Sequence, residues 1–137
     1  MGDRRIIRRM SDFDLKSEVR SFFAQEFFKS HIVVWLIALS LVANVANWII
    51  LRVFIKPVDF SIILHYNVYF GVDMLGDWKR VFLLPIIGLI IFFINLFLAI
   101  YFYERKERIA SYLLLMAVLM IQLSLIIASV SLIIINY

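Results

Sequence analysis

Three long runs of apolar residues dominate the pattern of this chain. They cover about residues 32–51, 81–103 and 109–135, and no Lys, Arg, Asp, Glu or His lies within any of them. A helix needs about 20 apolar residues to cross the roughly 30 Å hydrocarbon core of a bilayer, and it satisfies its own backbone hydrogen bonds there. The pattern therefore predicts an all-α membrane protein with three transmembrane helices. The first run is longer than the apolar core of a signal peptide, so we expect it to be a retained anchor.

Residues 1–30 precede the first run and form a basic, amphipathic arm. Within it, residues 11–30 show helical spacing of the apolar side chains, which are Leu15, Val19, Phe22, Phe23 and Phe27. Such an interfacial helix lies along the membrane surface with its apolar face among the lipid headgroups. Ahead of it stand four cations that we expect to contact anionic headgroups of the bilayer, namely Arg4, Arg5, Arg8 and Arg9. The alternative is a segment that only fixes the orientation of the first span.

The loop at residues 56–80 shows a different pattern, because apolar residues occupy every second position. One parity of this alternation reads Phe60, Ile62, Leu64, Tyr66, Val68 and Phe70. The spacing favours an extended, β-like segment, which Gly71 and Gly76 then interrupt, although a helix would also bring several apolar residues to one face. A lone strand leaves backbone groups unpaired, so the segment folds back as a hairpin, lies irregularly at the interface or pairs with another chain. The six alternating residues are our candidates for partner contact, and burial among headgroups is the alternative.

A few polar side chains interrupt the three apolar runs. Besides the serines of the third run, they are Ser40, Asn44, Asn47, Asn95 and Gln122. Counted from the span centres, Asn44 and Gln122 lie near mid-membrane, whereas Ser40 and Asn95 share a level nearer the cytoplasmic side. Amides at one depth form hydrogen bonds between transmembrane helices, so we expect interhelical contacts here, with a polar path or ligand site as the alternative. Pro85, early in the second run, predicts a kink.

The distribution of basic residues predicts the orientation. Of the 14 Lys and Arg residues, seven precede the first span, four lie in the first loop and three in the second. Cytoplasmic segments carry an excess of Lys and Arg, and a cytoplasmic arm and second loop place ten inside against four outside. We therefore expect a cytoplasmic N-terminus, an exterior loop at 56–80 and an exterior C-terminus. Nothing resembles an organelle address, which favours the plasma membrane.

The residues offer little support for catalysis or for nucleic-acid binding. The chain has no cysteine and a net charge of only +4, and topology already accounts for its cations. No ionisable residue lies within a span, where proton relays and ion paths usually carry one, and no phosphate-binding, HExxH or GxSxG motif occurs. In the loop, His65, Asp73 and Asp77 are spaced by eight and four residues, which matches no compact ligand motif. We assign no enzyme activity, catalytic residue, cofactor, metal or nucleic-acid partner.

Residues 64–73 read Leu-His-Tyr-Asn-Val-Tyr-Phe-Gly-Val-Asp. This run resembles the LHYN-x-YFG-x-D segment of a family of small three-span membrane proteins from bacterial lineages with reduced genomes. Two further spans separated by a short charged turn, here residues 103–108, extend the resemblance over about residues 32–137. No activity is assigned to that family, so the resemblance implies a recurring architecture and no chemistry.

Together these features predict two parts, a cytoplasmic arm at 1–30 and a three-span membrane domain at 31–137. The function that we expect is non-enzymatic: an accessory, scaffold or assembly subunit of a membrane complex, with a membrane-protein partner or a second copy of the chain. The alternative is a small homo-oligomeric channel or a lipid-binding protein. In that case the amides would line its interior, and they are Asn44, Asn47, Asn95 and Gln122.

Overall fold

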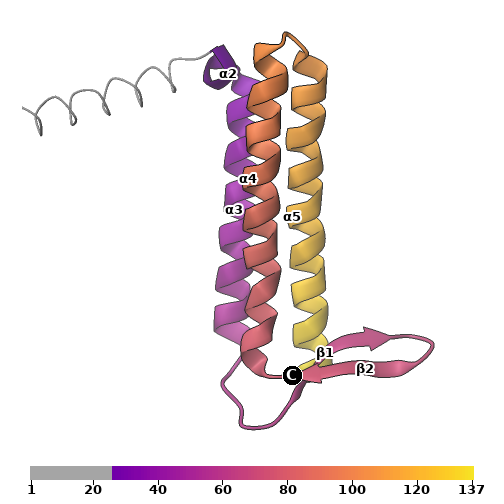
Figure 1. Cartoon of the computed structure of the whole chain (residues 1–137). Helices are drawn as coiled ribbons and strands as arrows, with labels where there is room; N and C mark the ends of the chain where they lie inside the picture. Colours follow the sequence, from indigo (N-terminus) through magenta and orange to yellow (C-terminus); the bar gives the residue numbers. More distant parts are fainter. Residues whose placement is uncertain (1–25) are drawn as a thin grey trace, which may run out of the picture.

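The computed structural model describes residues 26–137, which form a bundle of three long helices with a β-hairpin at one end (Figure 1). The predicted arm helix lies mostly outside the described residues, as do the candidate headgroup contacts Arg4, Arg5, Arg8 and Arg9. Its described part is the short helix α2 (Glu26–Lys29), which ends before Ser30.

The three long helices are α3 (His31–Phe54), α4 (Leu83–Glu104) and α5 (Arg108–Asn136), and a 3₁₀ turn, η1 (Trp78–Phe82), leads into α4. The shortest of them has 22 residues, a length of about 33 Å. All three are long and apolar enough to cross a membrane. The prediction of three apolar helices is confirmed, and their number and length support a multi-pass membrane protein.

The helices pack through a narrow stripe of buried positions on each of them. On α5, the helix that packs along both others, these positions are three or four residues apart or a sum of such steps, and they are Ser111, Leu115, Val118, Gln122 and Ser129. Such spacing is typical of knobs-into-holes bundles. The remaining faces carry exposed Leu, Ile, Val, Phe and Met side chains, as helices in contact with lipid require. A polar residue in a stripe therefore faces another helix.

The two ends of the bundle differ. The end that carries α2 and the α4–α5 turn, here called the turn end, contains a cluster around Phe27, Tyr103 and Leu115. Phe27 was expected to face lipid headgroups, but it is only 1% exposed and packs edge-on against Tyr103 with ring centroids 5.3 Å apart. It is buried by protein because the break at Ser30 lets α2 fold over the ends of the helices.

At the other end, the hairpin end, the predicted extended segment forms two strands. Strands β1 (Ile62–Asn67) and β2 (Gly71–Gly76) pair antiparallel. Of the three alternatives for the loop, the structure has the hairpin, but its second strand lies between the two glycines that were expected to interrupt the pattern. The chain turns at residues 68–70 because the side chain of Asn67 accepts from the backbone amide of Tyr69 and Gly71 adopts a φ of 77°, a conformation that glycine allows at little cost.

Pro85, where a kink was predicted, lies at the beginning of α4. It is the third residue of α4, which is continuous from Leu83 to Glu104. In the first turn of a helix the amide has no partner within the helix, so proline removes no hydrogen bond there. The irregularity of this segment lies one turn earlier, in η1, where Asp77 accepts from the backbone amide of Lys79.

Candidate functional site

A layer of side-chain amides joins the three helices, near the middle of α3 and α5 and at the first two turns of α4. The side-chain amide of Asn44 donates to the carbonyl of Pro85 at 2.9 Å and to Oε1 of Gln122 at 3.2 Å. Gln122 in turn donates to the carbonyl of Gly88 at 2.9 Å. The structure thus brings together Asn44 of α3 and Gln122 of α5, and it connects both to backbone carbonyls of α4.

Gly88 makes this layer sterically feasible. A Cβ atom at this position would lie 2.8 Å from Oε1 of Gln122 and 3.1 Å from Nδ2 of Asn44. Both amides are buried, and the contacts between them are direct. This geometry favours an interhelical contact over a polar path at this level.

The other polar candidates are not brought into the layer. Ser40 and Asn95 each donate to a carbonyl four residues earlier in their own helix, those of Leu36 and Ile91. Asn47 is fully buried, and neither atom of its amide has a hydrogen-bond partner within residues 26–137. Such a group is costly in an apolar interior, and nothing in the described part of the chain offsets that cost.

The base of the hairpin is held by the end of α5. Oδ1 of Asn136 accepts from the backbone amide of Ile63 at 2.8 Å, and Nδ2 donates to the carbonyl of Ile63 at 2.8 Å and to that of Leu132 at 2.9 Å. The side chain therefore takes the place that a neighbouring strand would occupy on β1. Ile62 is buried beside it with Leu51 and Val81.

Sequence reasoning missed Asn136, since a polar residue at the end of an apolar run looks like a simple terminus. The next residue also holds the loop, because the hydroxyl of Tyr137 donates to the carbonyl of Lys56 at 3.1 Å. Two neighbouring polar side chains at the end of an apolar run, an amide and a hydroxyl, could have indicated this contact with the loop.

The tip of the hairpin is apolar and exposed. Val68, Tyr69 and Phe70 are 84%, 91% and 85% exposed, and the hairpin extends sideways from the end of the bundle (Figure 1). The predicted contact residues are consequently divided. Ile62 is buried at the base and Leu64 is half-buried, whereas the remaining four are exposed, and these are Phe60, Tyr66, Val68 and Phe70. Two shifts of the strand register break the expected alternation of faces.

The loop residues that were considered for metal or acid–base chemistry separate in the structure. Nδ1 of His65 lies 2.6 Å from Oδ1 of Asp73 across the two strands, and both side chains are solvent-accessible. Asp77 instead caps η1. Within residues 26–137 no group of three or more His, Cys, Asp or Glu side chains could hold a metal ion. The pair is a cross-strand contact at the surface of the hairpin.

Comparison of the chain with protein-family models, with curated proteins and with solved structures finds no match. The resemblance drawn from the loop motif stays a prediction. Function must therefore be inferred from the hairpin, the amide layer and the ends of the bundle.

Proposed function

We propose that this protein is a non-enzymatic accessory, scaffold or assembly subunit of a membrane complex, and that its hairpin contacts a membrane-protein partner. In this proposal it lies in the plasma membrane with its N-terminus in the cytoplasm and with the hairpin and C-terminus outside. The excess of Lys and Arg in the arm and in the second loop, ten against four, supports this orientation. The arm would lie on the cytoplasmic surface and contact anionic headgroups.

The main support for the proposal is that the hairpin has an exposed apolar tip and a base held against the helices. Asn136 and the buried Ile62 hold the root of the hairpin, so that the apolar tip at residues 68–70 is presented away from the helices. A partner that binds a preorganised surface of this kind loses little conformational entropy. Exposed aromatic side chains are also typical anchors of protein interfaces.

The outer edge of β2 offers a second means of contact. Asn136 occupies the corresponding edge of β1 at Ile63, whereas no side-chain hydrogen bond in the described part of the chain reaches the backbone of residues 71–76. An unpaired edge can accept an added strand. The tip and this edge lie on one hairpin, and together they form the proposed partner surface.

Charged substitutions at the tip test this proposal. Tyr69→Asp and Phe70→Asp should reduce the recovery of a stoichiometric partner in mild detergent tenfold or more, because a charge is costly to bury in an apolar contact. His65→Ala, on the same hairpin, is the matched control and should leave recovery unchanged. Mass measurement of the complex checks the composition. Full recovery with both tip variants, or loss only with the His65 variant, would contradict the assignment.

A small homo-oligomeric channel or a lipid-binding protein is the second candidate. Asn95 favours self-association, because its amide lies half-buried on α4 and, within residues 26–137, bonds only to the carbonyl of Ile91 in its own helix. Partly exposed amides of transmembrane helices pair with other helices. A closed ring of identical chains in the same mass measurement would support this candidate against the accessory role.

A further inference from the structure

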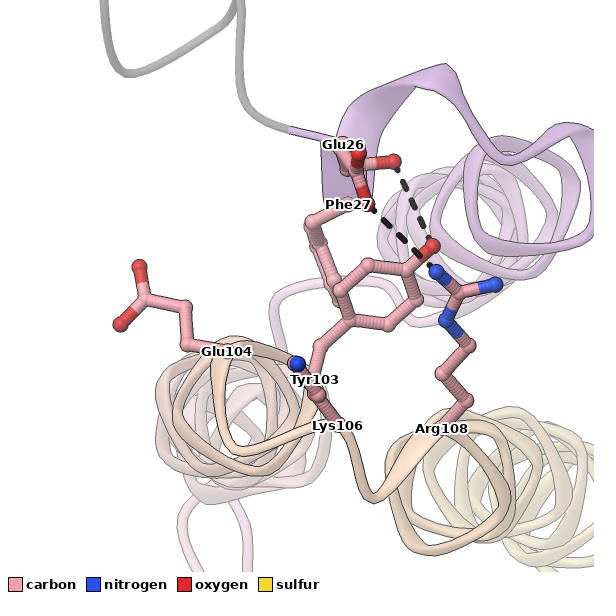
Figure 2. A pocket seen from close by; sticks show the side chains of 6 residues that line it. All are labelled: Glu26, Phe27, Tyr103, Glu104, Lys106 and Arg108. Carbon is pink, nitrogen blue, oxygen red and sulfur yellow. Dashed lines mark hydrogen bonds and ion pairs between the residues drawn. The ribbon is translucent and has the colours of Figure 1, made fainter.

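A pocket with both charged and aromatic residues in its lining lies at the turn end of the bundle, opposite the hairpin. It has a volume of about 510 Å³ and lies between α2, the end of α4 and the start of α5 (Figure 2). The residues that line it are Glu26, Phe27, Tyr103, Glu104, Lys106 and Arg108. An adjoining hollow shares three of these and adds Lys29, Ser30 and Tyr112. We call the two together the turn-end pocket.

Charges of both signs face this pocket. Arg108 lies over the ring of Tyr103, 5.4 Å from its centroid, and its guanidinium is 3.5 Å from the carboxylate of Glu26. Glu104 lies on the opposite side of Tyr103 from Arg108 in this view (Figure 2). The lining therefore offers both cationic donors and carboxylate acceptors.

The contact between Arg108 and Glu26 leaves both groups available to a ligand. Their side chains are 59% and 77% exposed, and an exposed ion pair at this distance is weak. A guanidinium has five N–H donors, and within residues 26–137 Arg108 has one interaction with an acceptor, the one with Glu26. Within the described residues, both side chains therefore keep hydrogen-bonding capacity for a ligand.

The backbone at Lys106 gives an independent reason to regard the cations as functional. Lys106 has a φ of 66°, and its amide donates to the carbonyl of Tyr103, which places it in the left-handed position that follows many helices. Glycine occupies that position without strain. The chain instead carries a lysine there, and its side chain lines the pocket.

The position of the pocket along the helix axes indicates the kind of ligand. The α4 helix ends at Glu104 and α5 begins at Arg108, so the pocket lies where apolar spans end and lipid headgroups begin. Phe27 and Tyr103 form its apolar wall. A headgroup that carries both a phosphate and an ammonium matches a lining of both signs, whereas a purely anionic headgroup would offer no cationic group to Glu26 and Glu104.

We propose that the turn-end pocket binds the headgroup of a zwitterionic phospholipid with a primary ammonium, as in phosphatidylethanolamine. The phosphate lies against Arg108 and Lys106, and the ammonium donates to Glu26 or Glu104. A quaternary ammonium, as in phosphatidylcholine, has no N–H to donate and is bound less well. This inference is independent of the hairpin and of its partner.

Lipid retention by the full-length protein tests the proposal. The protein is reconstituted into bilayers with equal parts of phosphatidylethanolamine, phosphatidylcholine and phosphatidylglycerol, extracted in mild detergent and analysed by native mass spectrometry. We expect phosphatidylethanolamine to be retained at least threefold over each of the other two. Arg108→Gln should reduce retention of all three lipids, and Glu26→Gln combined with Glu104→Gln should abolish the preference for ethanolamine over glycerol headgroups.

Two variants of the same turn serve as controls. Arg105 stacks on Tyr101 and Glu107 does not line the pocket, so Arg105→Gln and Glu107→Gln change the charge of this turn without changing retention. Equal retention of the three lipids, preference for phosphatidylglycerol, or the same loss in the control variants would overturn the proposal. Displacement of the lipid by a large excess of soluble phosphoethanolamine is expected if the headgroup is recognised, whereas binding of phosphoethanolamine at least as tight as that of the lipid would assign the pocket to a water-soluble ligand and would overturn the proposal.

Discussion

At the scale of single residues, the sequence could predict which polar groups share a depth but not what they bond to. Asn44 and Gln122 were placed at one level by counting from the span centres, and the structure joins them. Two further acceptors are the carbonyls of Pro85 and Gly88. The two side chains reach these carbonyls because Gly88 has no Cβ atom and lets them approach the backbone of α4. The spacing of residues in the sequence does not predict so close an approach between helices.

Substitution of Asn44 should show what the amide layer contributes. Asn44→Leu removes the donor to Pro85 and Gln122, and we expect it to lower the free energy of unfolding by about 1–2 kcal/mol. Asn95→Leu is the control, because its amide bonds only within α4, and we expect a change below about 0.5 kcal/mol. Unfolding in detergent micelles with increasing dodecyl sulfate measures both. Equal effects of the two substitutions would show that the layer adds nothing beyond helix packing.

At the scale of elements, the helices were predictable and the hairpin was predictable only in part. Charged or polar residues flank the apolar runs, so the predicted bounds 32–51, 81–103 and 109–135 fall within three residues of the bounds of α3, α4 and α5. The alternating pattern located β1. It could not locate β2, because that strand follows a turn set by Asn67 and Gly71 and its own sequence, with Asp73 and two glycines, has little β-propensity.

The attachment of the hairpin to α5 leads to a prediction about local stability. Asn136→Leu removes both hydrogen bonds to the backbone of Ile63, so the base of β1 should open more often while the helices remain intact. We expect at least tenfold faster hydrogen exchange at the amide of Ile63. Ser131→Ala is the control, because that hydroxyl bonds only to Ile127 of its own helix. Unchanged exchange in the Asn136 variant would mean that packing of Ile62 alone holds the hairpin.

At the scale of the whole molecule, the arrangement of the helices determines which parts share a side. Three helices long enough to cross a membrane put the hairpin and Tyr137 at one end and α2 and the α4–α5 turn at the other (Figure 1). The turn-end pocket and the hairpin surface would therefore face opposite leaflets. A ligand in one and a partner on the other do not compete for space.

The absolute orientation depends on charge and gives the last prediction. If the ten Lys and Arg residues of the arm and second loop, against four in the first loop, govern insertion, a reporter fused after Tyr137 should be active only outside the membrane. A reporter inserted at Lys106, in the turn between α4 and α5, is the control and should be active only in the cytoplasm. Substituting the three cations of that turn with Gln leaves seven against four, so the same orientation should persist. A cytoplasmic signal from the Tyr137 fusion would reverse the orientation, placing the hairpin and its partner in the cytoplasm and the turn-end pocket in the exterior leaflet.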